Sequence, residues 1–167
     1  MDYLIRNKFV SVGGSSVVRD MQNNDQFFVK GRIFTFTRKK FVTDLAGKTL
    51  FIVRNKFFHI FLPKVYICDG EGNVILMLKK KNAFSLRADF DIFKADGTLS
   101  NYSIDGDIIG WNFTIKQAGL PIATVHRNFN VVDSFTLSTS LIDQAPFLIA
   151  LVIAIDNWVD KLQDSNN

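Results

Sequence analysis

The sequence predicts a mainly β fold, a closed antiparallel barrel of about twelve strands that encloses one hydrophobic C-terminal helix. Three observations lead to this prediction. Apolar and polar residues alternate along much of residues 3–141, turns with a glycine recur at a nearly constant spacing, and an apolar helical segment occupies about residues 144–162. We treat residues 1–167 as one domain, because 47% hydrophobic residues are enough for a substantial core.

The strands are predicted from period-two alternation, which places successive side chains on opposite faces. Residues 84–92 are the clearest case, since one face would carry only apolar side chains and the other only polar ones. Residues 109–116 show the same alternation. The apolar faces are Phe84, Leu86, Ala88, Phe90 and Ile92 in the first segment, and Ile109, Trp111, Phe113 and Ile115 in the second.

The turns are predicted from four glycines, Gly47, Gly72, Gly97 and Gly119, which are 25, 25 and 22 positions apart. Each glycine follows one apolar-rich segment and precedes another. Glycine tolerates the positive φ of a tight hairpin turn, and a nearby aspartate can accept hydrogen bonds from the local backbone. The spacing therefore predicts a repeated β-hairpin unit.

The helix is predicted from "QAPFLIALVIAIDNWVDK", in which Pro146 to Ile155 carries no charge. Ten helical residues span about 15 Å, roughly half of a bilayer's hydrocarbon core, so we expect no transmembrane span. This part of the helix has no polar stripe, and a helix that is apolar on all sides has to be buried on all sides. A closed barrel buries it and also removes exposed sheet edges. Insertion into a membrane interface is the alternative.

The charge of the chain is unevenly distributed. Residues 1–82 hold 15 Lys/Arg and 6 Asp/Glu, a net +9, whereas residues 83–167 hold 5 and 10, a net −5. A basic half attracts phosphate-bearing partners. With Cys68 as its single cysteine, the chain forms no internal disulfide, and the first ten residues lack an apolar leader, so we expect a cytoplasmic location.

The order of these parts resembles the LURP-one-related family of the tubby C-terminal-like superfamily, which also contains the phospholipid scramblases. The resemblance rests on the repeated D-x-x-G hairpins followed by "DQAPFLIALVIAIDNWVDK", and it extends over essentially the whole chain. It implies a twelve-stranded barrel around a central C-terminal helix. It also implies that basic side chains on the barrel exterior bind lipid headgroups, as in tubby domains.

The sequence offers little for catalysis. His59 and His126 both lie in strand-like contexts, where a structural role is the commoner one, and Cys68 has no visible activating partner. A calcium loop starting at Asp69 would place Lys80 where a bidentate glutamate is needed. We therefore expect no enzyme activity, no metal site and no cofactor.

The candidate site is a pair of basic clusters, one at Arg38, Lys39 and Lys40 and the other at Lys79, Lys80 and Lys81. In one interpretation these residues are strand ends and turns whose charges keep the barrel soluble and discourage edge pairing. In the other, the clusters meet at one rim and bind an anion, because several basic residues together can hold a protein at an anionic membrane.

The function we favour is therefore a non-enzymatic module that binds anionic phospholipid or phosphoinositide-like headgroups at the cytoplasmic face of the membrane, or another phosphorylated ligand. The alternative is a soluble barrel that binds proteins or a small ligand and has no role with lipids. Nucleic-acid binding needs exposed aromatic rings among basic residues. We do not expect it, because Phe34, Phe36 and Phe41 are predicted to face the core.

Overall fold

The computed structural model describes residues 1–6, 15–31, 39–55, 64–81, 90–128 and 134–165, and these form twelve strands, a 3-10 turn and one helix. The strands are β1 (Asp2–Arg6), β2 (Ser15–Asp20), β3 (Asp25–Gly31), β4 (Lys40–Thr43), β5 (Thr49–Asn55), β6 (Lys64–Asp69), β7 (Val74–Lys80), β8 (Phe90–Lys94), β9 (Tyr102–Asp107), β10 (Asn112–Gln117), β11 (Leu120–Asn128) and β12 (Ser134–Thr139). The turn η1 (Ile142–Gln144) leads directly into the helix α1 (Ala145–Ser165).

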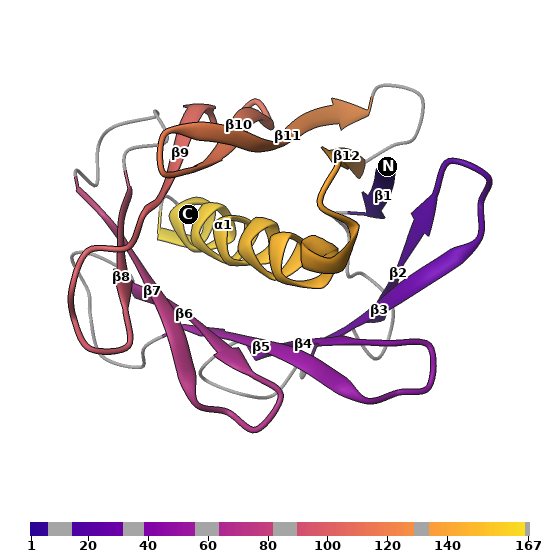
Figure 1. Cartoon of the computed structure of the whole chain (residues 1–167), viewed down its shortest axis with the longest axis horizontal. Helices are drawn as coiled ribbons and strands as arrows, with labels where there is room; N and C mark the ends of the chain where they lie inside the picture. The colour runs from indigo at the N-terminus through magenta and orange to yellow at the C-terminus, as the bar shows by residue number, and fades with distance from the viewer. Residues whose placement is uncertain (7–14, 32–38, 56–63, 82–89, 129–133, 166–167) are drawn as a thin grey trace.

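The strands form one antiparallel sheet in the order β8-β7-β6-β5-β4-β3-β2-β1-β12-β11-β10-β9. Each strand pairs with its neighbour along the chain except β8 and β9, which are the two ends of the sheet, and β1 pairs with β12. Between β8 and β9 the described residues are joined by a bridge between Phe93 and Leu99 and a 2.7 Å hydrogen bond from the Ser100 amide to the Ile92 carbonyl. The predicted barrel is confirmed, and it is nearly closed (Figure 1).

Helix α1 lies in the middle of the barrel with strands around it (Figure 1). Every residue from Leu148 to Ile155 is at most 1% exposed, so all sides of the helix are buried, as predicted. Residues 142–159 are long and apolar enough to cross a membrane, with a mean hydropathy of 1.4, but 72% of this window is buried inside the protein. The apolar surface of the helix therefore forms the core.

The four predicted glycine turns are confirmed, since φ lies between 80° and 99° at Gly47, Gly72, Gly97 and Gly119. A further turn of this kind joins β2 and β3, where Asn23 takes the glycine position with φ 66°. Asparagine tolerates this conformation better than most residues, so the glycine spacing does not predict this turn.

The prediction for residues 109–116 is partly wrong. Phe113 and Ile115 are buried on β10, but the strand begins at Asn112. Residues 108–111 form a turn in which Trp111 has φ 53° and Ile109 is 38% exposed. Side chains alternate between the two faces only within a continuous strand. The turn at residues 108–111 interrupts the strand, so the alternation does not extend across it. Of the segment 84–92, the described part has Phe90 and Ile92 buried as predicted.

The connections alternate between the two ends of the barrel, because all pairings are antiparallel. The end where α1 enters, called here the helix-entry end, carries the connections 21–24, 44–48, 70–73, 95–101, 118–119 and 140–144. The opposite end, called here the far end, carries the turn 108–111 and the last residues of β1, β3, β5, β7 and β11. The basic residues of the predicted site lie toward the far end.

Candidate functional site

Four basic residues lie on the outside of three adjacent strands near the far end, or directly after one of them. They form what is called here the outer basic band: Arg54, Lys64, Lys79 and Lys81. Lys64 of β6 lies directly opposite Lys79 of β7. On the neighbouring pair, Arg54 of β5 lies opposite Tyr66, and its guanidinium carbon is 5.1 Å from the centre of the Tyr66 ring.

The strand alternation explains why these side chains point outward. Val53 and Asn55 are buried on either side of Arg54, and Leu78 and Lys80 are buried on either side of Lys79. Because successive residues of a strand point to opposite faces, Arg54 and Lys79 project away from the core. Both side chains are half-buried, as expected for long side chains that lie along the sheet surface.

Like charges directly opposite each other destabilise a sheet, so the Lys64–Lys79 pair weakens the barrel unless an anion lies nearby. Asp91 of β8, which pairs with Lys79, is an acidic neighbour of the band. Its carboxylate is 3.4 Å from the Lys81 ammonium, and the side chains are 34% and 56% exposed. The contact therefore leaves Lys81 accessible to solvent, and the band as a whole is suited to an external anion.

Two of the predicted site residues point into the barrel instead. The Lys40 ammonium lies 2.6 Å from an Asp156 carboxylate oxygen, and the side chains are only 11% and 2% exposed. Lys80 is fully buried, and its ammonium is 4.9 Å from the ring centres of both Phe90 and Trp158. The two rings meet edge to face at 5.5 Å. Both lysines therefore hold α1 in place from inside.

The two predicted clusters are separated by two strands, β5 and β6, which lie between β4 and β7 in the sheet. Lys39, Lys79 and Lys81 are at least partly exposed, Lys40 and Lys80 are buried, and Arg38 lies outside the described residues. Lys40 pairs with Val53, so antiparallel register places Lys39 beside Arg54. Arg54 on β5 and Lys64 on β6 lie between the two clusters. This position follows from the pairing of the strands and is not evident from the sequence.

Phe41 was predicted to face the core, and its position in β4 shows that this prediction is wrong. It lies between the buried residues Lys40 and Val42 and is half-buried on the outer face. The long Lys40 side chain takes the inner position because it reaches an acidic partner on α1. Phe34 and Phe36 lie outside the described residues.

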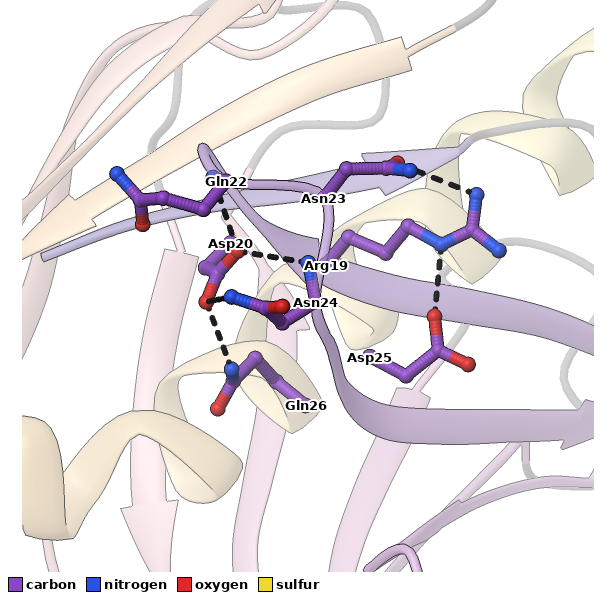
Figure 2. Close-up of polar contacts among 7 residues, drawn as sticks. All are labelled: Arg19, Asp20, Gln22, Asn23, Asn24, Asp25 and Gln26. Carbon is purple, nitrogen blue, oxygen red and sulfur yellow. Dashed lines mark hydrogen bonds and ion pairs between the residues drawn. The ribbon is translucent and has the colours of Figure 1, made fainter.

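The lowered pKa values belong to turn carboxylates, and burial raises the pKa of Tyr3 and Tyr102. Figure 2 shows Asp20 accepting hydrogen bonds from the Gln22 amide at 2.9 Å, the Asn24 amide at 2.8 Å, and the side chains of Asn24 and Gln26, each at 2.9 Å. These bonds, that of the Asn24 side chain first, lower the pKa of Asp20. A bond from the Asn73 side chain is likewise the largest cause of the lowered pKa of Asp69.

Of the three residues that could serve in catalysis, the structure describes His126 and Cys68. His126 is exposed on β11, opposite Asn112 of β10 and Thr136 of β12. Cys68 is fully buried on β6. His59 lies outside the described residues. Over the part of the chain that the structure describes, no three His, Cys, Asp or Glu side chains come together as metal ligands would.

A shallow depression of about 340 Å³ lies at the helix-entry end, between the start of β1 and the hairpin of β11 and β12. Its lining combines apolar side chains with several hydroxyl groups. The lining residues are Met1, Asp2, Pro121, Ile122, Ala123, Thr124, Ser138, Thr139 and Ser140.

The barrel, its terminal helix and its turn repeat match one known family. The model of the LURP-one-related family matches residues 1–156. The chain belongs to the LURP-one-related family. The resemblance inferred from the D-x-x-G hairpins and the terminal helix is therefore confirmed.

Two similar proteins cover almost the whole of this LURP-one-related chain. An uncharacterised protein of Bacillus subtilis strain 168, YxjI, is 25% identical over 157 residues, which are 93% of this chain and 92% of that protein. An X-ray structure of a protein from Arabidopsis thaliana aligns with a TM-score of 0.62 and 18% identity, covering 93% of this chain and 89% of that one. The plant structure shows that the two chains share a fold.

Proposed function

We propose that this LURP-one-related protein is a non-enzymatic module that binds anionic phospholipid headgroups at the cytoplasmic face of a membrane through its outer basic band. The observation that supports the proposal is the position of Lys64 directly opposite Lys79, with Arg54 on the adjoining strand. A pairing of like charges weakens a sheet. Asp91 lies opposite Lys79 on its other side and balances part of this charge, and a bound phosphate would balance the rest.

The expected strength of binding follows from the number of charges. Each basic residue near an anionic surface contributes about 1 kcal/mol, so the four residues of the band contribute about 4 kcal/mol. This is enough for reversible peripheral binding and too little for permanent anchoring. Because exposed charges are screened by salt, binding should weaken steeply as the ionic strength rises.

Co-sedimentation with vesicles tests the proposal. We expect the protein to sediment with vesicles of phosphatidylcholine and phosphatidylserine at low salt, and to remain in solution with phosphatidylcholine alone. The double variant Lys64→Gln/Lys79→Gln should lose most of this binding.

The matched control is Lys48→Gln/Lys94→Gln, which removes the same charge from two exposed lysines toward the helix-entry end. It should bind like the wild type. Equal loss in both double variants would show that net charge alone drives binding, and no binding by the wild type at low salt would refute the proposal.

The second candidate function is a barrel that binds a protein or a small ligand without any role for lipid. The depression of about 340 Å³ at the helix-entry end favours it, because its lining offers both apolar surface and hydroxyl groups. It predicts equal behaviour with neutral and anionic vesicles.

A further inference from the structure

A row of three large side chains crosses the outside of the barrel next to the outer basic band. Tyr66 of β6 lies directly opposite Met77 of β7, and Met77 lies directly opposite Phe93 of β8. These three residues form what is called here the outer apolar row, and all of them are half-buried. Because neighbouring strands are about 4.8 Å apart, the row is about 10 Å long.

The row faces away from the core. Each member directly follows a buried residue of its strand, and successive residues of a strand point to opposite faces. The buried neighbours are Val65, Leu76 and Ile92. Phe27 and Phe51 are half-buried because they pack against the core, whereas, over the described residues, the side chains of the row make no such contact. Their remaining exposure is therefore on the barrel exterior.

The opposite side of the barrel carries polar side chains at positions of the same kind. Strands β10 and β11 lie across α1 from β5 and β6 (Figure 1). The outward residues of β10, β11 and β12 include Asn112, Thr114, Thr124, His126, Thr136 and Ser138. A sheet face that contacts water normally carries such polar groups. The outer apolar row therefore marks the side of β6, β7 and β8 as one that contacts something else.

Basic residues border the row on two sides. Lys64 and Lys79 are two residues away from Tyr66 and Met77 on the same strands, which places them about 7 Å farther toward the far end. Arg54 lies opposite Tyr66, with its guanidinium carbon 5.1 Å from the centre of the ring. Apolar side chains enter a membrane interface to a depth of about 5–10 Å, and long basic side chains bend back to the phosphates. The spacing between the row and the band fits this arrangement.

The chemistry of the row favours a membrane over two other occupants. A single-stranded nucleic acid needs aromatic rings on which its bases stack, but the central residue of the row is Met77. A symmetric dimer through this side would bring two basic bands together, and like charges repel each other. An anionic membrane offers phosphates to the band and an apolar interior to the row.

We propose that the outer apolar row enters the interface of an anionic membrane while the outer basic band contacts its phosphates. The ligand is then a phospholipid within a bilayer, and not a soluble phosphate. This role of the row rests on the proposed lipid binding and adds a contribution that salt does not screen. Part of the binding should therefore persist at about 0.5 M salt, which screens exposed charges.

A tryptophan placed in the row tests the insertion. Vesicles of phosphatidylserine and phosphatidylcholine whose acyl chains carry bromine near the headgroup should quench the fluorescence of Phe93→Trp and shift its emission to shorter wavelength. The wild type supplies the background, because Trp111 and Trp158 are only 6% and 1% exposed. His126→Trp, at an exposed position on the polar side, is the matched control and should show no quenching beyond that background.

A second pair of variants measures the contribution of the row to affinity. Met77→Thr/Phe93→Thr should bind vesicles of phosphatidylcholine and phosphatidylserine about tenfold more weakly at low salt, and it should lose the binding that persists at about 0.5 M salt. Leu4→Thr/Val17→Thr changes two half-buried outward residues of β1 and β2 and should bind like the wild type. Thermal unfolding checks that both variants fold. If Met77→Thr/Phe93→Thr does not fold, the quenching of Phe93→Trp decides.

Failure of the insertion is distinguishable from failure of lipid binding. If the wild type does not sediment with anionic vesicles at low salt, both proposals are refuted. If the wild type sediments but Phe93→Trp is not quenched, the row does not insert and headgroup binding by the band stands. The same conclusion follows if Met77→Thr/Phe93→Thr binds like the wild type.

Two other occupants of the row would also overturn the insertion. Binding of a single-stranded oligonucleotide that Met77→Thr/Phe93→Thr abolishes would show that bases stack on the row. Self-association of the wild type in sedimentation velocity that the same variant abolishes would show that the row contacts a second copy of the chain.

Discussion

Lys40 reaches across the inside of the barrel to Asp156 of α1, and the contact of 2.6 Å is almost closed to solvent. Lys80 lies deeper still, with its ammonium against the rings of Phe90 and Trp158. Both residues belong to runs of consecutive basic residues that look like solvated turns in the sequence. In the structure they link two strands to the central helix.

The buried ion pair leads to the first prediction. Lys40→Met removes the ammonium that lies 2.6 Å from the buried Asp156 carboxylate, which should lower the free energy of unfolding by about 3–5 kcal/mol. Lys40→Met/Asp156→Leu should be less destabilised than the single variant, because both charges of this pair are then replaced by apolar side chains. Chemical denaturation measures both, with Lys48→Met, at an exposed turn, as the control. A Lys40→Met variant as stable as this control would contradict the prediction.

The turn at Asp20 leads to a prediction about pH. Hydrogen bonds in the folded protein, that from the Asn24 side chain first, lower the pKa of Asp20 below its value in the unfolded chain, about 3.9. Such a carboxylate stabilises the fold above the unfolded pKa, and this contribution disappears as the pH falls through the folded pKa. The free energy of unfolding should therefore decrease as the pH falls below about 4.

Asn24→Ala removes the largest cause of the lowered pKa, so the loss of stability between about pH 6 and pH 3 should become smaller. The measurement is urea denaturation across this pH range. Asn112→Ala, at an exposed asparagine of β10, is the control and should keep the wild-type pH dependence. If the free energy of unfolding of Asn24→Ala depends on pH as that of the wild type does, the hydrogen bonds of this turn do not cause the loss of stability at low pH.

At the scale of elements, the barrel and its helix depend on each other. The inner face of the sheet carries small β-branched residues such as Val18, Val29, Val42 and Val53, all fully buried. These side chains leave space for α1, whose apolar residues fill it. Neither element can bury its apolar surface alone, so the two should fold cooperatively.

The helix supplies the prediction at this scale. Leu151→Ala removes a fully buried side chain from the centre of the core and should lower the free energy of unfolding by about 2–5 kcal/mol through lost burial and the cavity left behind. Leu99→Ala, at a position 63% exposed, is the control and should change stability by less than about 0.5 kcal/mol. Similar values for the two variants would mean that the helix is not the core.

At the scale of the whole molecule, charge is arranged along the barrel axis. The connections of the helix-entry end hold four acidic residues and one lysine, a net −3, and the outer basic band lies toward the far end. Helix α1 begins at this end, so the positive end of its dipole lies at the acidic rim.

The sequence by itself determined the strand pattern, four of the turns and the burial of the helix, because these follow from local rules. Alternation requires one apolar face, positive φ favours glycine, and a helix that is apolar all round has to be enclosed. The family could be inferred from the same features. The turn at Asn23 and the turn at residues 108–111 were missed because their backbone reversals use residues other than glycine at the positive φ.

Only the tertiary structure decided which basic residues face outward. In β7, the segment "VILMLKK" is apolar at both alternating sets of positions, so the sequence does not reveal which set is inside. In β4, the register shift between Val42 and Thr43 leaves both residues buried and breaks the alternation that would orient Lys39 and Lys40. The side that a lysine takes depends on partners that lie far away in sequence. For Lys40 that partner is Asp156, 116 residues later, and local pattern carries no information about a contact of that range.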